Sequence, residues 1–422
     1  MKHIKKTLLL PVILVSLIAC NGTNDVVFKE IYHLTEQNNF FKAKERYASH
    51  KGALSEMHQQ FIEAVLDNAF NKLEESQKKI NALLEQNSNI PDSIQLQLYK
   101  VKYDNSVKLY QYKEAKNTAQ LILSNYEKLL DEETISSYKN NLKIWTALEN
   151  TPSQKTDIKK KTSLKIETDI AGLKTLKVYA NKEPLNFIFD TGANLSTTSL
   201  SVATQSNMDI IPVDIEVGTI TGIKVSAQLA VCAKLTMGDI DIFNVIFLVL
   251  PDETLSFPEI DYQIYGILGF PVIEALKEIS ITQNGDFIVS SKTSIFSEYS
   301  NMAMKELTPL IYINDKHFTF DTGADETILY HAFYKESKKE IDENYQQKKI
   351  GFGGAGGNKE FDGYIIDYTF DIGGKQVKLD SISLLKEKIT ENETVYGNIG
   401  QDLIQSFNTM TINFNQMVIR FE

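Results

Sequence analysis

Apolar residues recur at steps of three and four positions from about residue 25 to residue 149. The segments "FNKLEESQKKINALLEQ" and "LYQYKEAKNTAQLILSNY" show this pattern, and few glycines or prolines interrupt it. Such spacing places the apolar side chains on one face of a helix. We therefore predict an α-helical domain over residues 21–150.

A weak repeat runs through this helical region. Pairs of a large and a smaller apolar residue, three positions apart, are separated by 30 and then 42 residues: Phe40/Ala43, Phe70/Leu73 and Tyr112/Ala115. The mean separation is near the period of about 34 residues of tetratricopeptide repeats. The region resembles degenerate tetratricopeptide helix hairpins, and an irregular helical bundle is the alternative.

The pattern changes after the polar stretch "NTPSQKTDIKKKTS", which has no periodicity and predicts a linker over residues 151–164. Short runs that alternate between apolar and polar residues follow, among them "SLKIET", "NFIFD" and "YIIDYTFDI". The longer apolar run "IFNVIFLVL" is too short to span a bilayer and predicts a buried strand. An all-β region is therefore expected from about residue 165 onward.

The β-region contains an internal duplication. "NFIFDTGANLS" and "HFTFDTGADETIL" share an Asp-Thr-Gly-Ala motif, and their aspartates, Asp190 and Asp321, are 131 residues apart. The same offset relates Gly269 to Gly400, and each of these glycines follows an apolar residue. The segments after them, "KEISITQNGDFIVS" and "NTMTINFNQMVIRFE", both read as a final pair of strands. These landmarks predict two related lobes, over residues 165–298 and 299–422.

The two motifs resemble those of the retropepsin-like aspartic proteases. The alanines Ala193 and Ala324 after the triplets favour this branch, since pepsin-like enzymes usually carry serine or threonine there. Retroviral members carry one motif per subunit and dimerise, whereas this chain carries both, as the bilobal pepsin-like enzymes do. The resemblance implies an all-β bilobal acid-protease fold after the helical domain.

Two carboxylates suit peptide hydrolysis, because a base must activate water while an acid protonates the carbonyl oxygen and the departing nitrogen. Held about 3 Å apart, two carboxyls share one proton and titrate as a pair. We therefore predict Asp190 and Asp321 as the catalytic residues. By the resemblance, the supporting residues cross-brace the two loops, allow their close approach or pack beneath them: Thr191, Gly192, Thr322, Gly323, Gly269 and Gly400.

The resemblance also implies flaps, which are hairpins that bind an extended peptide by strand addition. The segment "GFGGAGG" places Gly353 and Gly354 at one flap tip, and Gly222 falls at the matching position of the first lobe. One departure concerns the arginine that retroviral enzymes commonly carry after the second motif glycine. Phe270 and Gln401 occupy those positions here, so Asp325 lacks that partner.

The start of the chain reads as an export signal. The basic "MKHIKK" precedes the apolar "TLLLPVILVSLIA", and Cys20 follows directly. This layout is that of a secretory signal over residues 1–20, and its end resembles a bacterial lipobox in which Cys20 is lipidated. An ordinary signal with a coincidental cysteine is the alternative. A lipoprotein of this kind is expected in the cell envelope, lipid-anchored and outside the cytoplasm. The other cysteine, Cys232, reads as a small core residue.

Composition excludes several other functions. The formal charge is −11 and no basic stripe is present, so nucleic acid is not expected as a partner. The histidines show no metal-ligand spacing, and neither a metal nor another cofactor is expected. The sequence "GFGGAG" fits a dinucleotide pattern, but it precedes a strand-like segment and not a helix.

These observations predict a monomeric, lipid-anchored aspartic endopeptidase that acts on extended polypeptides. The alternative is a catalytically silent duplicated β-barrel that binds peptides or serves as an adaptor. In either case the helical domain could bind a protein partner.

Overall fold

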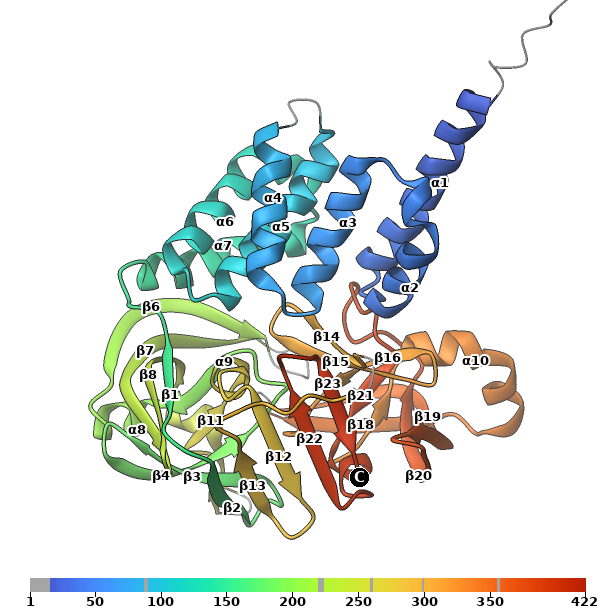
Figure 1. Ribbon diagram of the computed structural model, residues 1–422. Helices are drawn as coiled ribbons and strands as arrows, with labels where there is room; N and C mark the ends of the chain where they lie inside the picture. Colours follow the sequence, from blue (N-terminus) through green and yellow to red (C-terminus); the bar gives the residue numbers. More distant parts are fainter. Residues whose placement is uncertain (1–15, 87–89, 219–223, 259–260, 298–299, 355–356) are drawn as a thin grey trace, which may run out of the picture.

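The computed structural model describes residues 16–86, 90–218, 224–258, 261–297, 300–354 and 357–422. Helices form the first part of the chain and a β-rich region follows (Figure 1). Helices of the first part are α1 (Ser16–Glu36), α2 (Phe40–His50), α3 (Glu56–Ala69), α4 (Leu73–Gln86), α5 (Asp92–Lys108), α6 (Tyr112–Tyr126) and α7 (Glu132–Leu148).

Caps and left-handed turns set the ends of these helices. Ser55 and Asp131 cap α3 and α7, because each side chain accepts a hydrogen bond from the backbone amide three residues ahead. The turns from α1 to α2, from α3 to α4 and from α5 to α6 each contain a residue with positive φ: Asn38, Asn71 and Tyr110. Consecutive helices therefore form hairpins, and the predicted helical region is confirmed.

The hairpins correct the register of the predicted repeat. Phe70 lies just after α3, and Leu73 is the first residue of α4, as Phe40 and Tyr112 are the first residues of α2 and α6. The residue three positions after each helix start is fully buried: Ala43, Ser76 and Ala115. The predicted pairs were chosen as two apolar residues, whereas the small residue three positions after the start of α4 is the polar Ser76. The prediction therefore paired Phe70 with Leu73 instead. The tetratricopeptide resemblance stays a prediction.

The first lobe follows without a structureless linker. Strand β1 (Lys155–Ile158) lies inside the predicted linker and pairs with β8, and β2 begins at Thr162. The further elements of lobe 1 are β2 (Thr162–Thr168), β3 (Lys174–Ala180), β4 (Glu183–Phe189), β5 (Ser196–Ser199), α8 (Leu200–Gln205), β6 (Asp209–Gly218), β7 (Lys224–Met237), β8 (Ile240–Leu250), β9 (Ser256–Phe257), β10 (Tyr262–Gln263), β11 (Gly266–Leu268), α9 (Phe270–Glu274), β12 (Glu278–Thr282) and β13 (Asp286–Val289). The predicted buried strand at residues 242–250 is confirmed as part of β8.

Lobe 2 repeats this order with a longer helix. Its elements are β14 (Met302–Lys305), β15 (Thr308–Ile313), β16 (Lys316–Phe320), β17 (Ile328–Leu329), α10 (His331–Asn344), β18 (Lys348–Gly354), β19 (Gly357–Ile372), β20 (Lys375–Leu385), β21 (Gly397–Ile399), α11 (Gln401–Ile404), β22 (Thr409–Asn413) and β23 (Val418–Phe421). One sheet runs in the order β14-β15-β16-β21-β17-β20-β19-β18.

The two lobes share a sheet at their base. The final strands of lobe 2 join the final strands of lobe 1 in the order β23-β22-β12-β13-β2. Strand β22 pairs antiparallel with β12, from Glu278 opposite Asn413 to Thr282 opposite Thr409. Aromatic side chains fill the core beside this sheet, with Phe189 against Phe287 and Phe320 against Phe421. The lobes are therefore held together by backbone hydrogen bonds as well as by a common core.

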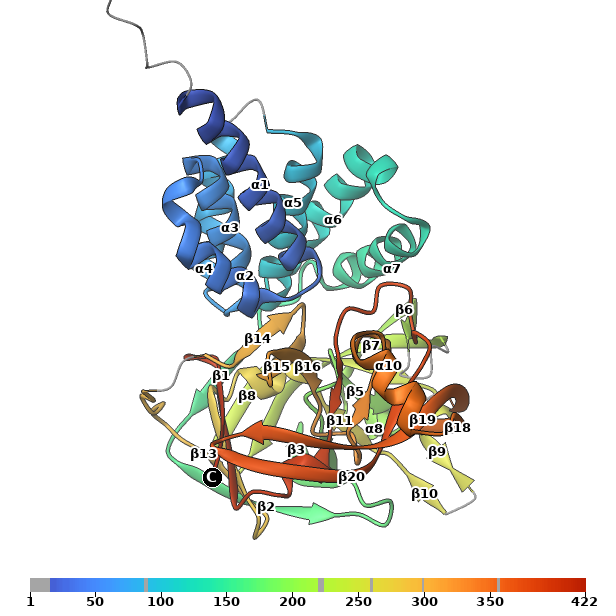
Figure 2. The ribbon, with the colours of Figure 1, turned by 90° about the vertical axis from the view of Figure 1, so that its right-hand side faces the viewer.

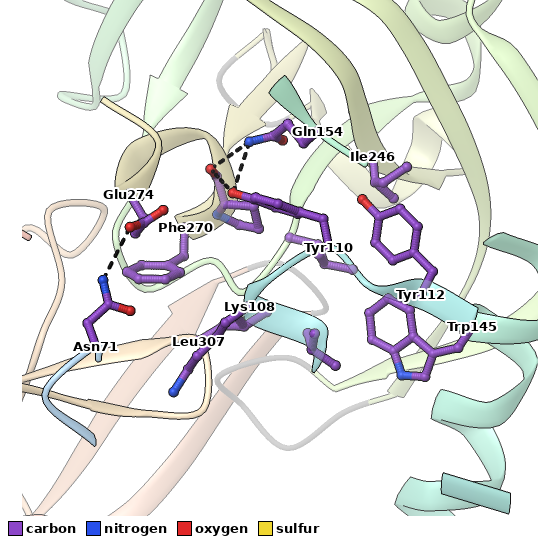
Figure 3. Close-up of a pocket in the computed structure, with 13 residues that line it drawn as sticks. Asn71, Lys108, Tyr110, Tyr112, Trp145, Gln154, Ile246, Phe270, Glu274 and Leu307 are labelled. Carbon is purple, nitrogen blue, oxygen red and sulfur yellow. Dashed lines mark hydrogen bonds between the residues drawn. The ribbon is translucent and has the colours of Figure 1, made fainter. Parts of the chain in front are cut away.

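The helical domain lies against both lobes (Figure 1). On lobe 1, the Tyr110 hydroxyl donates to the Pro271 carbonyl at 3.0 Å, and Asn71 donates to Glu274 at 3.2 Å (Figure 3). On lobe 2, Tyr312 stacks on Phe41 with 4.5 Å between ring centroids. The cavity left at this interface measures about 30 Å³, which is room for a single water molecule and not for a substrate.

Cys232 is fully buried, and burial raises the pKa of its thiol to about 11. The prediction of an inert core residue is therefore confirmed. Within the described residues, no helix has both the length and the apolar character that crossing a bilayer requires. Most of the predicted signal segment lies outside the described residues, and Cys20 lies within α1.

Candidate active site

Each motif aspartate directly follows a strand that ends beside a short parallel partner. Strand β4 pairs with β11, and the Asp190 amide donates to the Leu268 carbonyl at 3.2 Å. In lobe 2, β16 pairs with β21, and the Asp321 amide donates to the Ile399 carbonyl at 3.0 Å. Corresponding residues of these contacts differ by the 131 positions that separate the motifs. The duplicated sequence thus builds the same local structure twice.

The motif glycines hold the two aspartates. The Gly192 amide donates to Asp190 Oδ1, and the Gly323 amide donates to Asp321 Oδ1, both at 2.8 Å. A Cβ atom on Gly192 would lie 2.7 Å from Asp321 Cγ, and one on Gly323 would lie 2.4 Å from Asp190 Cγ. Each carboxyl therefore sits against the glycine of the opposite loop, at a separation that no other residue type allows.

The surroundings of Asp190 favour its protonated form. Asp190 is surrounded by protein atoms, although part of its surface remains accessible. Burial raises the pKa of Asp190 well above its usual range, and the negative charge of Asp321 and a hydrogen bond to it act in the same direction. A hydrogen bond between the two carboxyls requires a proton on one of them, because an ionised carboxylate can only accept.

The threonines cross-brace the loops. The Thr191 amide donates to Thr322 Oγ1 at 3.1 Å, and the Thr322 amide donates to Thr191 Oγ1 at 3.0 Å. Each hydroxyl also donates across the lobe boundary, from Thr191 to the Phe320 carbonyl and from Thr322 to the Phe189 carbonyl. Both threonines are buried. The relative position of the aspartates is therefore fixed by hydrogen bonds between the lobes.

Removing one hydroxyl from this cross-brace is expected to be costly. In Thr322→Val, the Thr191 amide and the Phe189 carbonyl lose their partners while buried, which costs about 2–4 kcal/mol of unfolding free energy. Urea denaturation measures this loss. Thr322→Ser keeps the hydroxyl and should retain most of the stability, so equal losses in the two variants would contradict the hydrogen-bond explanation.

The glycines beneath the loops are equally confined. A Cβ atom on Gly269 would lie 2.4 Å from the Leu195 carbonyl carbon, and one on Gly400 would lie 2.6 Å from that of Glu326. Their amides donate to side chains of the same lobe, Ser196 for Gly269 and Thr327 for Gly400, at 3.0 and 3.1 Å. These glycines let the catalytic loops pack directly on the segments behind them.

The sequence did not predict two side-chain contacts beside the aspartates. Asn398 Nδ2 donates to Asp321 Oδ2 at 3.2 Å, and Gln401 Nε2 donates to the Thr322 carbonyl at 2.8 Å. Their lobe 1 counterparts at the same offset are Ile267 and Phe270, which cannot make these contacts. The difference between Phe270 and Gln401 was visible in the sequence, and comparing the two halves position by position would also have shown the one between Ile267 and Asn398.

The flap positions are only partly described. Gly353 pairs with Asn358 and Gly354 with Gly357 in the β18–β19 hairpin. Strands β6 and β7 form the matching hairpin of lobe 1, and Gly222 lies outside the described residues. Asp325 is exposed, as expected from the missing arginine. In the described part of the chain, no three histidine, cysteine, aspartate or glutamate side chains gather as a metal site would require.

The raised pKa of Asp190 predicts how pH affects the stability of Asp190→Asn. A carboxyl whose folded-state pKa is raised stabilises the fold only when protonated, so the wild type loses stability as pH rises from about 4 through that pKa. Asparagine cannot ionise. Asp190→Asn should therefore have the higher melting temperature at pH 7, and its advantage should vanish near pH 3. A variant less stable than the wild type at pH 7 would contradict the assignment.

Comparison with known proteins supports the aspartic protease resemblance for lobe 1. Residues 176–272 match a family model described as aspartyl protease. The matched segment contains both Asp190 and Gly269, and the family is of the retropepsin type. No curated protein matches the chain.

Proposed function

We propose that this protein is an aspartic peptidase in which Asp190 and Asp321 jointly activate one water molecule. The observation that carries the proposal is the reciprocal packing of each aspartate against the glycine of the opposite loop. The family match of residues 176–272 supports the same class of chemistry.

The surroundings of the two carboxyls suggest how the roles divide. Asp321 accepts hydrogen bonds from the Gly323 amide and from the Asn398 side chain, which orient its two oxygens, whereas the hydrogen bonds to Asp190 come from the backbone amides of Gly192 and Ala193. Asp190 holds the shared proton, consistent with its raised pKa. Asp321 then takes a proton from water, which attacks the carbonyl carbon, while Asp190 protonates the carbonyl oxygen. Collapse of this intermediate breaks the C–N bond: the proton on Asp321 passes to the departing nitrogen, and one hydroxyl of the intermediate returns its proton to Asp190 as the carboxyl product forms.

The proposed substrate is a polypeptide in extended conformation, bound between the lobes and against the hairpins β6–β7 and β18–β19. Strand addition to these hairpins would fix its backbone. Because both aspartates belong to one chain, we propose that the monomer is active without a cofactor. We further propose that Cys20 anchors the mature protein in the cell envelope through lipid.

A peptide-library digest tests the proposal. The wild type should cleave a subset of peptides, identified by mass spectrometry, whereas Asp321→Asn should leave the library intact. Peptides retained on the wild type without cleavage would overturn the proposal and favour the silent, peptide-binding barrel.

A further inference from the structure

The helical domain contacts the β-region at one side of the catalytic centre. The peptide path proposed above, which we call the substrate groove, runs between the lobes and past both aspartates. The residues that follow the two motifs, Asn194 and Asp325, are equivalent in the two lobes and therefore lie on opposite sides of the aspartate pair, so we use them to mark the two ends of this groove. We name these the Asn194 end and the Asp325 end. The pseudo-symmetry of the lobes relates the two ends, so a difference between them comes from whatever packs outside the lobes.

The catalytic loop at the Asn194 end is connected to the helical domain through the turn between β14 and β15. Thr308 Oγ1 donates to Asn194 Oδ1 at 3.1 Å, which joins the catalytic loop of lobe 1 to the turn between β14 and β15. The next residue of that turn, Leu307, lines the narrow interdomain cavity together with Leu195 and with Lys108 from α5 (Figure 3). The turn therefore lies between the catalytic loop and α5.

The hairpin wall at this end is also fastened to the helices. Helix α7 lies beside strand β6 (Figure 2), and Asn140 both donates to the Glu216 carbonyl and accepts from the Glu216 amide, at 2.8 Å each. Lys143 donates to the Asp214 carbonyl at 3.0 Å. Strand β6 belongs to the hairpin proposed to cover the substrate, so α7 is fixed to the roof of the groove.

A loop of lobe 2 completes the enclosure. Residues 386–396 lead into β21, the strand whose Asn398 contacts Asp321. Asn38 donates to Thr394 in this loop at 2.8 Å, and Asn392 donates to Glu133 of α7 at 3.3 Å. The catalytic loop, the roof and the side wall at the Asn194 end are thus all attached to the helical domain.

The Asp325 end has a different environment. The turn equivalent to β14–β15 joins β2 to β3 in lobe 1, and its Ile170 is 74% exposed, whereas Leu307 is half-buried. Among the described residues, the side chains of α1–α7 that hydrogen-bond to the lobes reach β6, α9 and the 386–396 loop. None of those contacts lies at the β2–β3 turn.

We infer that the helical domain closes the Asn194 end of the substrate groove, so that a bound peptide extends freely only past the Asp325 end. This inference rests on the proposed peptidase function. It narrows the endopeptidase prediction to an enzyme that removes short pieces from one terminus of a chain.

The catalytic loop sets the length of those pieces. The Ala193 amide donates to the Asp190 carbonyl at 3.4 Å, so residues 190–193 form a tight turn. Asn194 therefore lies within roughly 11 Å of Asp190. An extended peptide rises about 3.3 Å per residue, so about three residues fit between the scissile bond and the enclosure.

A length series tests the inference. A core peptide cleaved in the library digest is extended one residue at a time, in one series at its N-terminal side and in another at its C-terminal side. In one series, kcat/KM should fall by about tenfold or more once the peptide extends more than about three residues beyond the scissile bond on the lengthened side. In the other series, kcat/KM should stay constant. The affected series identifies which terminus the closed end holds. Constant kcat/KM in both series would overturn the inference and leave the peptidase proposal intact, whereas no cleavage of any peptide would overturn that proposal itself.

Variants of α7 test whether the helical domain causes the limit on peptide length. Asn140→Ala combined with Lys143→Ala removes the side-chain hydrogen bonds that fasten α7 to β6 and should raise kcat/KM for the long peptides. Lys139→Ala is the matched control, because it lies on the same helix and pairs with Glu127 inside the helical domain. If the double variant kept the length limit of the wild type, closure by the helices would be wrong.

Discussion

Replacing either aspartate by asparagine is expected to lower kcat by about 10⁴-fold. Asparagine preserves the size of the side chain, and its carbonyl oxygen can still accept the hydrogen bond of the motif glycine, at Gly192 or Gly323. It can neither take a proton from water nor deliver one to the substrate. Because the two carboxyls act as one unit, Asp190→Asn, Asp321→Asn and the double variant should show similar losses. Initial rates with a library-selected peptide measure the effect.

Circular dichroism and thermal melting at several pH values distinguish lost chemistry from lost structure. The asparagine variants should retain the native spectrum. Residual activity within tenfold of the wild type in either variant, with the fold intact, would show that the carboxyl pair is not the catalytic group.

Gly323→Ala is expected to impair both activity and stability. The added methyl group would lie 2.4 Å from Asp190 Cγ, so either the carboxyl or the loop must move. Overpacking of this kind costs about 1–3 kcal/mol. Displacing one catalytic carboxyl by about 1 Å should lower kcat by about 10²-fold. Chemical denaturation and steady-state kinetics measure the two effects.

Gly52→Ala provides the control, because no atom lies within 4 Å of the position that its Cβ would take. This variant should match the wild type in kcat. A normal kcat in Gly323→Ala would mean that the two loops stand farther apart in solution than the structure places them.

The local structure of the two aspartate loops could be predicted because the same motif and the same spacing to a later glycine occur twice in the sequence. Matched positions such as Gly269 and Gly400 have equivalent neighbours in the two lobes. Residues 131 positions apart in the sequence therefore occupy equivalent places in the structure. The contacts made by residues that break the symmetry were not predicted. Asn398 and Gln401 occupy positions where lobe 1 has apolar residues, and the significance of a polar side chain there depends on what lies opposite it.

The placement of the helical domain could not be read from periodicity. An amphipathic pattern shows which face of a helix is buried but not what covers it. Asn140 and Lys143 look like solvent-exposed polar residues in the sequence, yet both bind the backbone of β6. The segment 151–164 was likewise predicted as a linker from its polarity, but β1 gains its stability from pairing with β8, which lies about 85 residues later in the sequence.

The pairing of β12 with β22 has a consequence for how the protein is made. Strand β12 of lobe 1 pairs with β13 of the same lobe, but its second neighbour, β22, is available only after residues 409–413 have emerged from the ribosome. Asp321 meets Ile399 and Asn398 only shortly before. A nascent chain therefore holds no assembled catalytic pair during most of its synthesis. If the pair is catalytic, as proposed, hydrolytic activity arises only late in synthesis, after β22 has paired with β12.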